Sequence, residues 1–405
     1  MISIVVSGRQ MFWYMSHGPV FTDLRIFMTG VKMVGSGAGH QLYNFDAQRK
    51  AQTELYPETR ASGLLPFNHL AYELLLYWPI SGLSYRTALL VWALVNVGLL
   101  FALAWLLAPY SRNLTRAAGA PLALCFLAFY PVMYVLGEGQ DSLVFTLLLV
   151  LSLRAMDAGS TFLAGFLLAF ACFKFHLALL IAFFVLLLRA RWRGMAGFVC
   201  GGVLVGGVSL AMVGPAILHD YPAMLRRQDV MTPWGFVPWF MPNLRGFLQW
   251  ALAPWLDEGT ILLVVFMCSA VVGVVAAWLV LRHGSMQDES MVYAVAILTA
   301  ILISYHLHMQ DLSMALLPMV FLAERAARGW SGVPAGGEAG KFSPSRLSIT
   351  VLAAAISALY LYRIGGVAFP VLVVRGCFLA VPLFVLWVVA LRWWTASPPS
   401  RIKAA

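Results

Sequence analysis

Charged residues are scarce in this chain. Asp, Glu, Lys and Arg make up 11% of its 405 residues, whereas hydrophobic residues make up 61% and the mean hydropathy is +0.83. A soluble domain has about 25% charged residues and roughly 45–50% apolar ones. The composition therefore excludes an ordinary soluble domain and predicts a polytopic membrane protein.

Three further absences narrow the chemistry. The five cysteines lie singly within apolar runs, where a thiol packs as a small hydrophobe, so the sequence predicts neither a disulfide framework nor a metal cluster. It contains no Asp-x-Asp motif and no glycine-rich phosphate loop followed by lysine and a hydroxyl residue. The net charge of +10 is dispersed between apolar segments, which favours membrane insertion and anionic lipids over nucleic acid. We therefore expect no metal, no cofactor and no nucleic-acid partner.

Apolar segments close to bilayer length recur along the chain. Residues 1 to 20 form a short first span interrupted by Arg9 and Gln10, without a signal-peptide cleavage pattern, and we expect a membrane anchor there. Residues 244–256 are too short to cross and are expected to lie flat. With the first span, the other runs predict about 11 to 12 crossings: 66–82, 87–108, 118–136, 140–154, 160–188, 194–217, 259–281, 290–304, 311–323, 347–366 and 369–391.

Basic residues set the expected orientation. The cluster Arg189, Arg191 and Arg193 has no acid nearby and marks the cytoplasmic side. Counting alternate passes from it leaves one conflict, because Arg112 and Arg116 come out on the outer side. The same count predicts a transmembrane core at 1–325 with outer loops 21–65, 218–258 and 305–310, a cytoplasmic loop at 326–346, and C-terminal helices with a basic cytoplasmic tail at 347–405.

Ionisable groups at or within apolar segments are costly and invite a functional explanation. Lys174 lies in the middle of a long apolar run, where snorkelling is hardest, which favours a functional role or a buried ion pair. Asp311 suits a helix N-cap as well as a site. His306 and His308 share one side of an extended segment. They are interpreted either as binding residues or as interfacial polar residues. Considered without its sequence context, Asp23 would be interpreted as an exposed carboxylate in a loop.

Several segments taken together are similar to glycosyltransferase family 87 of the GT-C membrane enzymes. This group includes mannosyltransferases that depend on polyprenyl-phosphate-mannose. The similar segments run in family order over about residues 20–325: TDLRIFMTG, GHQLY, PFNHLAYELLLYWPISGLSYRTALLVWALVN, GEGQDSLVFTLLL, AGFLLAFACFKFHLALL, MPNLRG and SYHLHMQDLSMALLP.

The resemblance implies an all-α polytopic bundle of GT-C type, with amphipathic interfacial helices in the first outer loop. It implies transfer of a hexose, with mannose expected, from a polyprenyl-phosphate donor to a lipid or glycan hydroxyl outside the bacterial inner (plasma) membrane. Asp23 holds the family's base position. The expected contacts to donor phosphate or sugar are Lys174, His306, His308, Arg245, Asn243 and Gln140, and an expected structural or acceptor site comprises Asp311, Glu73 and Tyr43.

The implied chemistry needs a single carboxylate. Phosphate is already a good leaving group, so one base can suffice where glycosidases use two carboxylates. A transporter or lipid flippase is the alternative, because it would also place Lys174, His176 and Glu73 within the membrane. The absence of an internal repeat and of paired broken helices favours the enzyme. A structural subunit in which Asp23 has no role is a third interpretation.

Overall fold

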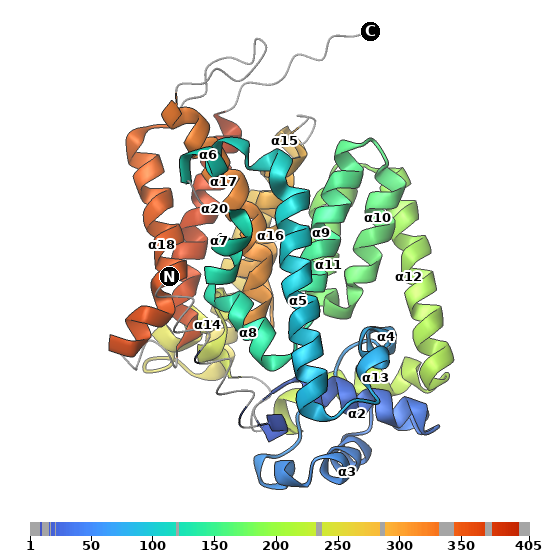
Figure 1. The fold of residues 1–405 in the computed structure, drawn as a ribbon. Coiled ribbons are helices and arrows are strands. Elements are labelled where there is room, and N and C mark those ends of the chain that lie inside the picture. The colour runs from blue at the N-terminus through green and yellow to red at the C-terminus, as the bar shows by residue number, and fades with distance from the viewer. Residues whose placement is uncertain are drawn as a thin grey trace.

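The computed structural model describes residues 18–20, 22–118, 121–231, 237–283, 288–331, 344–368 and 375–396, together with the single positions 9 and 16. Every regular element in these ranges is a helix (Figure 1). The predicted first span at 1–20 lies almost wholly outside them. The predicted all-α fold class is confirmed for the described part of the chain.

Five helical stretches are long and apolar enough to cross a membrane, which confirms a polytopic helical bundle. They are Tyr85–Tyr110, Thr161–Leu187, Trp192–Val213, Glu258–His283 and Gly376–Thr395. The first contains α5 (Tyr85–Leu107) and η6 (Ala108–Tyr110), the third and fourth are α12 and α15, and the last joins η11 (Gly376–Leu379) to α20 (Ala380–Thr395). Other helices complete the bundle: α7 (Leu122–Ala128), α8 (Tyr130–Glu138), α9 (Ser142–Asp157), α16 (Glu289–Ile303), η10 (Met309–Ala315), α17 (Leu316–Ser331) and α18 (Arg346–Ala368).

The stretch 161–187 does not cross the bundle as predicted for 160–188, because it folds back on itself. A straight helix would separate Thr161 and Leu186 by roughly 37 Å. Both residues nevertheless lie beside the same glycine, Gly194. A Cβ built on Gly194 would lie 3.2 Å from the Thr161 carbonyl oxygen and 2.8 Å from a Leu186 methyl carbon. The hairpin consists of α10 (Thr161–Phe170), the turn η7 (Ala171–Lys174), α11 (Phe175–Ala182) and the π-helical turn η8 (Phe183–Leu187). Lys174 therefore lies at the tip of a helical hairpin.

The predicted crossing at 66–82 is also wrong. The structure has only η4 (Ala71–Glu73), α4 (Leu74–Tyr77) and η5 (Trp78–Ile80) there, pieces far shorter than the ~20 residues a crossing needs. Their apolar side chains pack with α2 (Leu24–Gly35) in a second hydrophobic core. Counted back from Arg189, the loss of the crossing at 160–188 reverses the predicted side of residues 83–159, and the further loss of the crossing at 66–82 leaves the predicted side of residues 21–65 unchanged.

That reversal resolves the conflict at Arg112 and Arg116. Both lie on α6 (Arg112–Ala118), whose first amides bond to Glu324 of α17. The neighbouring Arg325 pairs with Asp288, and the next residue, Glu289, pairs with Arg189 and Arg191. Figure 1 shows α6, the end of α17 and the loop before α12 at the upper end of the bundle. We call this the basic end.

The opposite end carries the predicted interfacial helices (Figure 1). α2 packs against α3 (Phe45–Leu55), which begins after Asn44 because the Asn44 carboxamide oxygen accepts bonds from two first-turn amides at 3.0 Å. The segment 244–256, predicted to lie flat, forms the short helix α14 (Leu244–Leu252). The other elements of this end are η1 (Gly18–Val20), η2 (Gly39–Gln41), η3 (Pro57–Ser62), α13 (Ile217–Met231) and η9 (Pro238–Phe240).

Candidate active site

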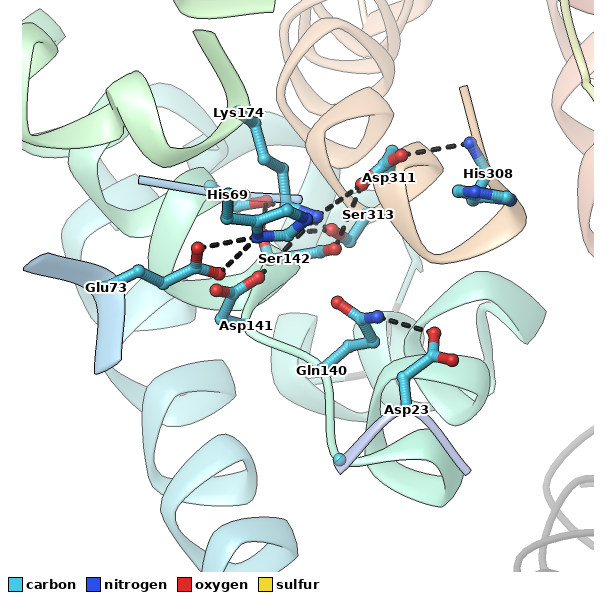
Figure 2. A network of polar contacts seen from close by, with 12 residues as sticks. Asp23, His69, Glu73, Gln140, Asp141, Ser142, Lys174, His308, Asp311 and Ser313 are labelled. Atoms are coloured by element: carbon cyan, nitrogen blue, oxygen red, sulfur yellow. Dashed lines mark hydrogen bonds and ion pairs between the residues drawn. The ribbon is translucent and has the colours of Figure 1, made fainter. Parts of the chain in front are cut away.

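A cavity of about 620 Å³ opens at the end that carries α2. Residues from nearly the whole chain line it, and most of its polar lining comes from segments singled out in the sequence. Of the predicted site residues, six line the cavity: Asp23, Gln140, Lys174, His306, His308 and Asp311. Figure 2 shows two groups of contacts, one around Asp23 and the other around Lys174.

Asp23 immediately precedes α2 but does not cap it with its side chain. Its Oδ2 accepts a hydrogen bond of 2.6 Å from the Gln140 carboxamide, and its side chain is only partly buried. The carboxylate is thus oriented by one donor and still faces the cavity. A partly solvated, oriented carboxylate of this kind is available to accept a proton.

The turn that carries Gln140 is tightly held. It follows α8 through Gly139, which has φ +70° and leaves so little room that a Cβ there would lie 2.8 Å from the Leu24 Cβ. The Gln140 backbone carbonyl oxygen accepts bonds from the Trp92 indole at 3.0 Å and the Asn96 side-chain amide at 3.3 Å, both on α5. The left-handed glycine and these two donors fix the backbone from which the Gln140 side chain reaches Asp23.

Lys174 is held between two carboxylates (Figure 2). Its Nζ lies 2.8 Å from Asp311 Oδ1 and 3.5 Å from Asp141 Oδ1, and its side chain is 6% exposed. Asp311 also accepts a bond of 2.9 Å from the backbone N–H of His308 and one of 3.2 Å from the Ser142 hydroxyl. The N-cap of η10 is His308 and not Asp311, which stands at the third position of the turn, accepts the His308 backbone N–H and pairs with a buried cation.

Behind this pair lies a histidine with a buried glutamate. His69 Nδ1 is 2.6 Å from both carboxylate oxygens of Glu73, which is fully buried and does not line the cavity. Burial raises the pKa of Glu73 to about 7 and lowers that of His69 to about 4. One ligand atom each of His69, Glu73 and Asp141 lies within 4.8 Å of the others, a spacing that could hold a metal ion. The Lys174 ammonium beside Asp141 already supplies a cation to this group.

We expect Glu73→Gln to stabilise the protein relative to wild type as the pH rises from 4.5 to about 7. The folded-state pKa of Glu73 is raised from 4.5 to about 7, so its contribution to stability is lost as the pH rises through this interval. The glutamine variant does not titrate and keeps this contribution. The difference in free energy of unfolding between the variant and wild type therefore approaches about 3 kcal/mol at most. Melting temperatures in detergent between pH 5 and pH 8 measure it, with the exposed Glu54→Gln as the control. Parallel curves for wild type and Glu73→Gln would contradict this account.

Three neighbouring histidines, His176, His306 and His308, also line the cavity. The His306 and His308 rings are 4.2 Å apart between centroids, and His176 lies 6.2 Å from His306. Burial lowers the pKa of both His306 and His308. At neutral pH these two imidazoles are therefore hydrogen-bonding groups rather than cations.

Four predicted site residues do not line the cavity; three of them contact a residue that does, and Asn243 contacts Ser304, the neighbour of the lining residue Tyr305. Asn243 caps α14 and donates to the Ser304 carbonyl at 2.7 Å, while Arg245 donates to the Tyr305 carbonyl at 3.0 Å. Both therefore fix the segment that leads to His306. Tyr43 donates to the His69 carbonyl at 3.0 Å, and Glu73 contacts the His69 ring.

Arg25 is a cavity residue that sequence reasoning did not assign. Its side chain is buried, and its guanidinium donates to the Ser62 hydroxyl at 3.0 Å and the Gly63 carbonyl at 3.2 Å. Both partners are neutral, and no carboxylate within 4.0 Å of it is found among the described residues. The signal in the sequence was the position of Arg25, on the first turn of the amphipathic helix that follows Asp23.

The fold and cavity define a polytopic membrane protein with a polar, partly apolar-lined site at one end of the bundle. The chain belongs to glycosyltransferase family 87, because the profile of that family matches residues 73–304, more than half of the sequence. It is therefore a membrane glycosyltransferase. Neither the curated proteins nor the solved structures contain a match to the chain. The matched range includes Gln140 and Lys174, whereas Asp23, His306 and His308 lie outside it.

Proposed function

We propose that the chain transfers a hexose, with mannose as the expected sugar, from a polyprenyl-phosphate donor to a hydroxyl of a lipid or glycan acceptor. One observation carries the proposal: in a chain of this family, the Asp23 carboxylate lines the same cavity as an arginine, a lysine and the paired histidines. A carboxylate can serve as the base, and cations with hydrogen-bond donors can receive the leaving phosphate.

In this proposal Asp23 removes the proton of the acceptor hydroxyl as that oxygen attacks C1 of the sugar. The bond from C1 to the phosphate oxygen breaks, and its electron pair leaves with the lipid phosphate. Gln140 supports the role because its amide, 2.6 Å away, orients the carboxylate. Since phosphate needs no proton to leave, we expect one base and no metal ion to suffice.

The phosphate would be bound by Arg25 and Lys174, with His306, His308 and Gln140 as hydrogen-bonding groups around phosphate and sugar. Arg25 is the stronger candidate, because its hydrogen-bond partners are the neutral oxygens of Ser62 and Gly63, whereas Lys174 is already engaged by Asp141 and Asp311. A guanidinium also fits phosphate through two parallel bonds. Asn243 and Arg245 would act indirectly, by holding the backbone that presents His306.

The lipid part of the donor would use the apolar portion of the same cavity. Apolar side chains from separate segments contribute to its lining, which suits a long isoprenoid that binds by surface area and not by specific contacts. These residues are Ile26, Leu65, Leu225, Phe240 and Met309.

The cavity would face the outside of the bacterial inner membrane, since the basic end should be cytoplasmic. Single cysteines in a background free of native cysteines test this, at Lys50 on α3 and at Arg193 near the start of α12, both exposed. We expect a membrane-impermeant maleimide to label Lys50→Cys on intact cells and Arg193→Cys only after permeabilisation. The reverse pattern would overturn the orientation.

A flippase for a lipid-linked substrate is the alternative, because the ion pairs around Lys174 are buried inside the bundle. Proteoliposomes with radiolabelled polyprenyl-phosphate-mannose and a lipid extract separate the two. We expect label to move from donor to a new lipid or glycan. Donor that crosses the bilayer unchanged, with no new product, would support the flippase.

A further inference from the structure

A second cavity, of about 450 Å³, lies at the basic end, away from the proposed active site. It is formed between α5, η6, α6 and the start of α7, with Arg112 and Arg116 on one side. Nothing in the proposed transfer reaction uses this cavity. Its lining combines two cations with an apolar groove.

The two arginines form an exposed pair. They are four residues apart on α6 and so share one face of the helix. Each of the described acids at this end has another partner. Asp157 accepts a bond from the Tyr110 hydroxyl, and Asp288 pairs with Arg325. Glu289 pairs with Arg189 and Arg191, and Glu324 bonds to the α6 amides and Arg328. Among the described residues, no carboxylate lies within 4.0 Å of Arg112 or Arg116.

Glu324 explains why this face of α6 is presented outward. Its carboxylate accepts bonds from the backbone amides of Asn113 and Leu114 at 2.9 and 2.8 Å and from the Asn113 side chain at 2.7 Å. Glu324 itself is buried. These bonds fix the inner face of α6 on α17 and leave the arginine face beside the groove.

The groove is apolar and is made by small side chains. Ala104 and Ala108 hollow one wall beside Phe101, which is 63% exposed, and the other wall comes from Pro121, Leu122 and Ala123. An exposed aromatic residue and small neighbours on a membrane-crossing helix leave room for a hydrocarbon chain. A soluble anion would have no use for this part of the cavity.

We propose that this cavity binds one anionic phospholipid, with its phosphate at Arg112 and Arg116 and the start of an acyl chain in the groove. Charge complementarity selects the headgroup, because two exposed cations without an acidic partner among the described residues line the cavity. The groove selects a lipid over free phosphate. Basic pockets between helices at the cytoplasmic face are a recurrent form of lipid site.

Native mass spectrometry of the full-length protein with equimolar dioleoyl-phosphatidylglycerol and dioleoyl-phosphatidylcholine tests the proposal. We expect wild type to retain one phosphatidylglycerol in preference to phosphatidylcholine. Arg112→Gln with Arg116→Gln should lower that preference roughly 30-fold, the sum of two surface-charge contributions. Arg193→Gln, an exposed arginine of the same end outside the groove, is the matched control and should retain the lipid.

Ala104→Phe tests the groove separately, because it fills the apolar wall and keeps both arginines. It should release the bound phosphatidylglycerol. Retention of that lipid by the double glutamine variant would overturn the proposal. Retention by Ala104→Phe would also overturn it, because the lipid would then be held by diffuse surface attraction and not by the groove. An equal loss in Arg193→Gln would also overturn it, because the effect would then belong to the whole basic end.

Discussion

Asp23→Asn is expected to slow sugar transfer by about 100- to 10,000-fold, the usual contribution of a general base. Asparagine keeps the size of the side chain and can still bond to the Gln140 carboxamide, which lies 2.6 Å from the Asp23 carboxylate in the native protein. It cannot accept the acceptor's proton. Binding of the donor should therefore change little while transfer is nearly lost.

The exposed Asp46→Asn, an acid on α3 of the same loop, serves as the matched control and should transfer at the wild-type rate. Donor affinity and single-turnover rate are measured on one preparation of each variant. Unchanged transfer in Asp23→Asn would remove the residue from the mechanism. Loss of donor binding along with transfer would assign it a binding role instead.

Lys174→Met is expected to reduce both stability and rate. Removing the ammonium leaves the buried Asp141 and Asp311 carboxylates without their cation, and breaking a buried pair typically costs about 3–5 kcal/mol. If Lys174 also contacts the leaving phosphate, its loss should slow transfer by roughly 100- to 1,000-fold.

A combined variant separates these two effects. Lys174→Met with Asp141→Asn and Asp311→Asn removes the uncompensated charges, so thermal stability should largely recover. We expect the transfer rate not to recover with it. A rate that returns together with the melting temperature would assign Lys174 to the buried ion-pair network alone.

The hydropathy of the sequence was enough to predict a helical membrane bundle, but not the path of every apolar segment. A run of 160–188 is long enough for one crossing, yet it forms a hairpin with Lys174 at its tip. The segment 66–82 is apolar because it packs in a core with α2, not because it meets lipid. Both segments are apolar and close to the length of a crossing, and only tertiary packing distinguishes them from true crossings.

The contradictory charges at Arg112 and Arg116 were the signal of the error at 160–188. Counted back from the Arg189 cluster, a crossing assigned wrongly there reverses the predicted side of the segments before it, and basic residues on the outer side violate the positive-inside bias. The unexpected lysine within 160–188 was a second signal, because a cation at the centre of a crossing helix is costly. Both conflicts pointed to the segment that the structure shows as a hairpin.

The candidate site could be predicted as a set of residues but not as an arrangement. Gln140 and Asp23 are 117 positions apart, and Lys174 and Asp311 are 137 apart, so no local pattern relates them. The family resemblance selected Asp23 as a site residue, and the position of Lys174 in an apolar run selected the lysine. The buried pair of His69 with Glu73 and the buried guanidinium of Arg25 needed the tertiary structure, because burial and partner geometry decide their roles.

The most direct test of the central claim is a transfer assay in nanodiscs. Purified wild type and Asp23→Asn are incubated with radiolabelled polyprenyl-phosphate-mannose and a membrane lipid extract in the presence of a metal chelator, and labelled products are quantified. The account predicts a new labelled product for wild type and at least about 100-fold less for Asp23→Asn. Equal product from both proteins, or none from wild type that binds the donor, would contradict it.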